Sequence, residues 1–100
     1  MSNLAEHEFE REVRRIMRRL AEPQSFVAAA GKEEYALHAA SDNWKKPVMR
    51  IAARIWEAFV RRDLVSICLR PDGKSETGWQ LSETGRAYWR RLAPQPDPFR

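Results

Sequence analysis

A long helical pattern runs over residues 47–62. Its apolar positions recur at steps of three and four residues, which is the signature of a buried helix face. Pro47 suits the first turn of a helix, where its missing N–H costs nothing. On a helical wheel of about 100° per residue, a mostly cationic stripe lies opposite the apolar face. The apolar face consists of Val48, Ile51, Ile55 and Phe59, and the opposite stripe of Arg50, Arg54, Glu57 and Arg61.

Two more helices are predicted, one on each side of this segment. Residues 5–21 carry a regular apolar stripe that predicts a helix. Pro23, two residues later, prevents the helix from continuing. Near the other end of the chain, Ser82 is a natural N-cap for a helix that runs to Leu92. Gly85 inside that helix costs about 1 kcal/mol relative to alanine, so we expect it to pack closely against another backbone. The first stripe consists of Phe9, Val13, Ile16, Met17 and Leu20.

Between the last two helices the period changes from helical to alternating. Residues 65–70 alternate apolar and polar positions, and residues 78–81 read as a returning strand. Pro71, Asp72 and Gly73 between them supply a fixed φ, a local hydrogen bond and a positive φ, which predicts a turn. We therefore expect a β-hairpin here.

Residues 24–43 allow two interpretations. A strand at residues 25–27 could pair with one at residues 35–40, or the second run could form a short helix, since it contains good helix formers. The alternation of Tyr35 and Leu37 with smaller or polar residues favours the hairpin. The proline-rich residues 93–100 cannot form a helix or a central strand and are expected to be a tail or linker after a single domain of residues 1–92.

Composition narrows the classes of protein that this chain can belong to. With 43% hydrophobic residues it is too apolar for a disordered chain, and no run is long enough to span a membrane. A single cysteine, Cys68, cannot form an internal disulfide and is compatible with a reducing cytoplasm. The chain carries a net charge of +4, whereas residues 44–62 alone carry +5. This concentration of positive charge indicates a polyanionic partner.

The order of helix, strand, turn, strand and helix resembles the end of many bacterial winged-helix domains. Regulators of the MarR and PadR kind share the stretch after the wing, carried here by Leu81, Ser82, Gly85, Arg86 and Tyr88. The chain also resembles an uncharacterised family of short bacterial winged-helix proteins, in the runs at residues 18–23, 35–37 and 97–100. The resemblance implies one α+β winged-helix-like domain, with three main helices, a wing β-hairpin and, if residues 24–43 form it, a second small hairpin.

The same resemblance implies a DNA-binding transcriptional regulator or regulatory module. In that family the helix before the wing is the recognition helix, so residues 47–62 would enter the major groove and residues 65–81 would assist as the wing. The residues expected to contact double-stranded DNA are Lys45, Lys46, Arg50, Arg54, Arg61, Arg70 and Lys74. The arginines of residues 11–19 could also contact phosphate, but we expect a solvated helix face there, because nearby glutamates cancel their charge.

A second function is a protein-interaction module on the same scaffold. Met49 and Trp56 lie off the main apolar face of residues 47–62, so they could pack under the first helix, which is the commoner outcome, contact a partner or form the surface of a homodimer. Catalysis finds no support, because neither His7 nor His38 is spaced to activate Cys68. No short pairing of cysteines or histidines suggests zinc, and no glycine-rich loop suggests a phosphate site. We therefore expect a non-enzyme without cofactor or metal.

Overall fold

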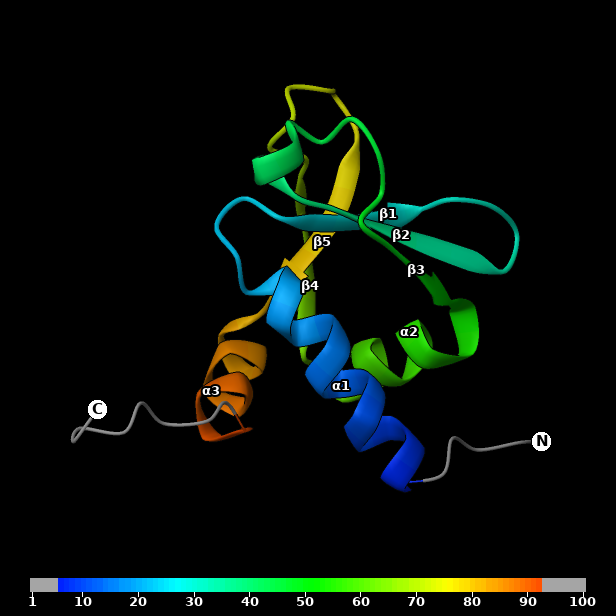
Figure 1. Cartoon of the computed structure of the whole chain (residues 1–100), viewed down its shortest axis with the longest axis vertical. Helices are drawn as coiled ribbons and strands as arrows, with labels where there is room; N and C mark the ends of the chain where they lie inside the picture. The colour runs from blue at the N-terminus through cyan, green and yellow to red at the C-terminus, as the bar shows by residue number, and fades with distance from the viewer. Residues whose placement is uncertain (1–5, 93–100) are drawn as a thin grey trace.

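Three α-helices and five β-strands make up residues 6–92, the part of the chain that this computed structural model describes (Figure 1). The helices are α1 Glu6–Leu20, α2 Ala53–Arg61 and α3 Glu83–Leu92. The strands are β1 Phe26–Ala29, β2 Glu34–His38, β3 Met49–Ala52, β4 Val65–Leu69 and β5 Thr77–Leu81, and a short 3-10 helix, η1, spans Ala40–Asp42. The tail expected at residues 93–100 lies outside the described residues.

All five strands belong to one antiparallel sheet with the order β3-β2-β1-β5-β4. Two local units build it, a three-stranded meander of β1, β2 and β3 and a hairpin of β4 and β5. Pairing of Val27 in β1 with Trp79 in β5 joins the two units. Figure 1 shows α1 lying between α2 and α3, with the three helices gathered along one side of the molecule.

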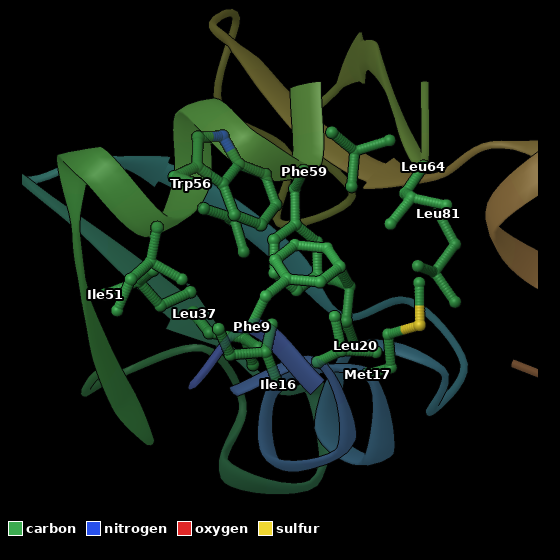
Figure 2. Packing of buried hydrophobic residues seen from close by; sticks show 14 residues of the cluster. Phe9, Ile16, Met17, Leu20, Leu37, Ile51, Trp56, Phe59, Leu64 and Leu81 are labelled. Atoms are coloured by element: carbon green, nitrogen blue, oxygen red, sulfur yellow. The ribbon is translucent and has the colours of Figure 1, made fainter. Parts of the chain in front are cut away.

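The hydrophobic core lies between the helices and one face of the sheet. Phe9 of α1 meets Phe59 of α2 with ring centroids 5.7 Å apart, and Trp56 stacks on Phe59 at 5.4 Å (Figure 2). Leu37 and Ile51 contribute from the sheet and are fully buried. Large side chains from every layer therefore close a single core, as expected for a domain of this size.

The winged-helix prediction is wrong. A winged-helix domain with three helices and a wing hairpin does not match a five-stranded antiparallel sheet. The correction concerns mainly residues 47–62, which do not form one long helix. Residues 49–52 are strand β3, and only residues 53–61 are helical. The helix that precedes the β4–β5 hairpin is therefore α2, which begins only at Ala53.

Pairing with β2 explains why residues 49–52 form a strand. Met49 lies opposite Leu37 and Ile51 opposite Tyr35, so the two apolar residues face the core. Arg50 and Ala52 alternate with them and are exposed. The same four residues thus satisfy a two-residue period as well as a helical one, and a partner strand decides between the two.

Several local predictions are confirmed. Residues 6–20 form the first helix, with the predicted apolar stripe buried. The hairpin interpretation of residues 24–43 holds, since β1 and β2 pair in register from Phe26 with His38 to Ala29 with Tyr35. The β4–β5 hairpin forms as predicted. Ser82 caps α3, because its Oγ accepts a hydrogen bond from the Gly85 N–H at 2.9 Å.

Candidate nucleic-acid interface

The outer face of α1 carries the densest group of arginines in the described chain. Residues 9, 13, 16, 17 and 20 bury the opposite side of the helix in the core. At about 100° per residue, the arginines therefore gather on the side turned to solvent. All of them are exposed except Arg19, which is half-buried. They are Arg11, Arg14, Arg15, Arg18 and Arg19.

Only part of this positive charge is neutralised. Arg15 pairs with Glu12 at 2.6 Å and Arg19 with Glu22 at 3.2 Å, both along the same segment. None of the ion pairs within residues 6–92 involves Arg11, Arg14 or Arg18. Three guanidinium groups on one exposed helix face thus carry charge without a carboxylate partner in this part of the chain.

Four of these arginines line an open hollow of about 390 Å³ beside β3. The lining residues are Arg14, Arg15, Arg18, Arg19 and Met49. A planar guanidinium can donate two parallel hydrogen bonds to a phosphate group, so such a hollow suits the oxygen atoms of a phosphodiester. The thioether of Met49 adds an apolar group to the lining of the hollow.

Helix α3 adds further cations next to α1. Arg14 Nη1 donates a hydrogen bond of 3.2 Å to the carbonyl of Leu92, the last residue of α3. The exposed arginines of α3 are Arg86, Arg90 and Arg91. We call the exposed arginines of these two neighbouring helices the α1/α3 basic surface.

The predicted arginine stripe is dispersed in the structure. Arg50 lies on β3 and pairs with Glu34 of β2 at 2.7 Å. Arg54 lies in the first turn of α2 and pairs with Glu8 of α1 at 2.9 Å. Arg61 lies in the last turn of α2 and lines a different hollow. Two of the three expected DNA contacts therefore hold carboxylates, and they lie on different elements.

The lysines and arginine expected at either end of the stripe are also separated. Lys45 and Lys46 lie in the segment between η1 and β3, where both are exposed. Lys74 lies in the turn between β4 and β5 and is exposed. Arg70 is largely buried, with 11% of its side chain exposed, and contacts Asp72 at 2.7 Å and Glu76 at 3.0 Å. We therefore assign Arg70 a structural role in the turn.

Arg70 joins the β4–β5 turn to Phe26 of β1. Its guanidinium lies 4.6 Å from the centroid of the Phe26 ring, and Phe26 stacks on His38 at 5.1 Å. Burial opposes ionisation of Asp72, but hydrogen bonds from Arg70 and from the Lys74 N–H outweigh it and keep the pKa of Asp72 below its ordinary value. Burial lowers the pKa of His38, which favours a neutral imidazole.

The two residues predicted to bind a partner lie in separate hollows. Met49 lies in the arginine-lined hollow, whereas Trp56 lines an apolar hollow of about 380 Å³ between α2 and the sheet. Trp56 is fully buried and packs edge-on against Trp79 at 6.2 Å. It is a core residue that only borders this hollow. The lining residues are Tyr35, Trp56, Glu57, Val60, Arg61 and Trp79.

Sequence reasoning did not select the α1 arginines because it expected the nearby glutamates to cancel their charge. Glu8 in fact pairs with Arg54 of α2 and leaves the arginines of its own helix. Contacts between helices decide which charges remain, and spacing along one helix does not reveal them. The signal available in the sequence was the position of all five arginines opposite the apolar stripe.

The described residues give little support for a metal site or for thiol chemistry. Among residues 6–92 no group of three or more His, Cys, Asp or Glu side chains could hold a metal ion. Burial raises the pKa of the Cys68 thiol, which disfavours the nucleophilic thiolate. In the same part of the chain, no helix has the length and apolar character needed to cross a membrane.

Comparisons with protein-family models, curated proteins and solved structures give no match to this chain.

Proposed function

We propose that this domain is a non-catalytic, cytoplasmic module that binds the sugar–phosphate backbone of double-stranded DNA through the α1/α3 basic surface, as part of transcriptional regulation. The observation that carries the proposal is the exposed group of Arg11, Arg14 and Arg18 on one helix face, without carboxylate partners in residues 6–92. Regularly spaced cations of this kind release counterions from DNA and supply affinity.

Helix α1 offers arginines, which bind phosphate and can also bind guanine, but no side chain that reads adenine. Its sequence, EHEFEREVRRIMRRL, contains no Asn or Gln, the residues that read adenine with two hydrogen bonds. Its exposed cations are all arginines, which bind phosphate oxygens well. We therefore infer binding with weak sequence preference and strong dependence on salt.

The test compares two double mutants that remove the same charge from different places. Arg11→Ala/Arg18→Ala removes two unpaired cations from α1, and neither side chain makes a hydrogen bond within residues 6–92. Arg50→Ala/Arg54→Ala removes two cations that hold Glu34 and Glu8. Binding of each variant to a random-sequence duplex is measured by fluorescence anisotropy at several salt concentrations.

We expect the α1 variant to lower the slope of log K against log salt by about two, because each lost phosphate contact lowers it by about one. The Arg50/Arg54 variant should keep most of the slope and affinity. Equal losses in both variants would mean that only net charge matters, and no binding at low salt would refute the DNA proposal. Circular dichroism of both variants controls for folding.

A protein-interaction module is the second candidate function. It is favoured by two large aliphatic side chains of β4, Ile67 and Leu69, which remain exposed. These residues lie on a different element from the α1 arginines, so both functions can belong to the same domain.

A further inference from the structure

Within residues 6–92, strand β4 is an edge of the sheet without the charges or proline that usually protect such an edge. In the order β3-β2-β1-β5-β4 it pairs with β5 on one side only. Its sequence, VSICL, contains no charged residue and no proline. Ile67 is 63% exposed and Leu69 is 76% exposed. An uncharged edge with exposed aliphatic side chains is a template for pairing with another strand.

Strand β3, at the opposite edge of the sheet, is protected against pairing with a further strand. Strand β3 has Arg50 at its centre, and this arginine pairs with Glu34 of β2. The chain then enters α2 directly at Ala53, so the helix follows the end of the strand without a loop. A charge and an adjoining helix hinder the approach of a further strand at this edge. The contrast singles out β4.

The hydrogen bonds at the two ends of the β4–β5 hairpin establish which backbone groups of β4 are free. Arg70 N–H donates to the Glu76 carbonyl at 3.1 Å, and Ser82 N–H donates to the Leu64 carbonyl at 3.0 Å. In an antiparallel ladder, hydrogen-bonded pairs alternate with pairs that are not bonded. Ser66 and Cys68 therefore bond towards β5, whereas Val65, Ile67 and Leu69 direct their N–H and C=O groups to the open edge.

We propose that a second copy of this chain pairs with this edge, so that the two β4 strands run antiparallel about a two-fold axis at Ile67. In this register Ile67 lies opposite the partner's Ile67, and Val65 lies opposite the partner's Leu69. All three outward-directed residues of each strand then form hydrogen-bonded pairs, which gives about six hydrogen bonds across the interface. The exposed aliphatic side chains meet on one face of the joined sheet.

Other registers use the edge less fully. An axis at Cys68 would place Val65 opposite the partner's Pro71, which has no N–H to donate. An axis at Ser66 would place Leu69 opposite the partner's Asp63, which lies before β4 and has a positive φ of 59°. Only the axis at Ile67 keeps every pair within the five strand residues. No like charges face each other in it, because β4 has none.

A cysteine at position 66 tests the register directly. In the proposed dimer Ser66 lies opposite the partner's Cys68 in a pair that is not hydrogen-bonded, where Cα atoms are about 4.5 Å apart. That distance allows a disulfide, whereas the two native Cys68 residues would lie about 8 Å apart, beyond disulfide reach. The Ser66→Cys variant should therefore form a covalent dimer in a mild thiol–disulfide buffer, and the native chain should not.

The matched control is Ser75→Cys, which also adds one exposed cysteine but places it in the β4–β5 turn. We expect Ser66→Cys to give at least about tenfold more covalent dimer than this control, because pairing raises the effective concentration of the two thiols. Equal amounts from both variants would refute the register.

A charge on the edge tests the interface without touching the core. Leu69→Lys in the Ser66→Cys background should abolish the covalent dimer, while Val60→Lys, at an exposed position of α2, should leave it unchanged. Sedimentation of the native chain should show a mass that rises with concentration from 11.7 kDa towards twice that value, and Leu69→Lys should remain a monomer.

A monomeric native chain at about millimolar concentration, or a dimer that is insensitive to Leu69→Lys, would overturn the proposal. The inference depends on β4 alone. Loss of DNA binding in the α1 variants therefore neither supports nor contradicts it.

Discussion

Gly85 of α3 lies directly against the carbonyl of Leu64. A Cβ atom added at position 85 would lie 1.9 Å from the Leu64 oxygen. That carbonyl accepts the Ser82 N–H at 3.0 Å, so it cannot move away without breaking a hydrogen bond at the start of the helix. The close packing predicted from the glycine in a helical pattern is thereby confirmed, and the contact is with backbone.

Gly85→Ala should therefore destabilise the fold, although alanine is the better helix former by about 1 kcal/mol. We expect the free energy of unfolding to fall by about 2–3 kcal/mol, the upper end of the cost of overpacking. Urea unfolding followed by tryptophan fluorescence measures the change. The matched control is Gly31→Ala, since a Cβ atom there would meet nothing within 4 Å. Equal midpoints for the two variants would contradict this account.

Removing the cap of α3 should have a smaller effect. Ser82 Oγ accepts the Gly85 N–H and donates to the Asp63 carbonyl at 2.6 Å, so it ties the helix to the preceding turn. We expect Ser82→Ala to cost about 1–2 kcal/mol, as for other N-cap serines. Thermal unfolding tests this, with the exposed strand residue Ser66→Ala as control. A loss no larger than in that control would show that the cap is dispensable.

The Asp72 carboxylate should make stability depend on pH. Its pKa in the folded protein lies below the ordinary value of 3.8, so its contribution is present above that pH and is lost as the pH falls through the lowered pKa. Asp72→Asn should therefore be less stable than the native chain at neutral pH, and the difference should shrink below about pH 4.

Urea unfolding of both chains between neutral and acidic pH measures this difference. Glu57→Gln is the control, because the Glu57 side chain makes no ion pair or hydrogen bond with other described residues. A difference between Asp72→Asn and the native chain that is the same at every pH would argue against the ionised hydrogen bond with Arg70.

The Arg54–Glu8 pair should contribute little to stability. The Arg54 side chain is 59% exposed, and exposed ion pairs give coupling energies of about 0.2–1 kcal/mol. A double-mutant cycle with Arg54→Ala and Glu8→Ala should return a value in that range and lose it at high salt. A coupling above about 2 kcal/mol would mean that the pair joins α1 to α2 structurally.

The sequence predicted elements well where local signals were sufficient. The stripe of α1, the turn after Leu69 and the cap at Ser82 each depend on residues close together in the chain, and all three are found. The prediction failed at β3. This strand pairs with β2, where Tyr35 lies opposite Ile51 although the two residues are far apart in the sequence. A helical reading of residues 47–62 was locally sound, and only the distant partner overrides it.

The segment before β3 contributed to the same error. Asn43 and Trp44 both have positive φ, 55° and 57°, which turns the chain back instead of leading it into a helix. Positive φ is uncommon for a residue as large as tryptophan, so nothing in the composition of this segment predicted it. The indole N–H of Trp44 donates a hydrogen bond to the Gln24 carbonyl at 2.9 Å, a contact between residues that are distant in the sequence.

The candidate site was only partly accessible from the sequence. An excess of positive charge in residues 44–62 was visible, but the sequence did not show that Arg50 and Arg54 pair with carboxylates on other elements. Arg70 looked like a wing contact and is instead enclosed by Phe26, Asp72 and Glu76. Which charges stay unpaired depends on the tertiary structure.

The pairing of Val27 in β1 with Trp79 in β5 has a consequence for the time course of folding. These residues lie about fifty positions apart, whereas the meander and the hairpin each form from neighbouring strands. Closing a long loop costs more chain entropy than closing a short one. We therefore expect the two units to form early and their joining to limit the folding rate, with the edge of β4 accessible to other chains in the meantime.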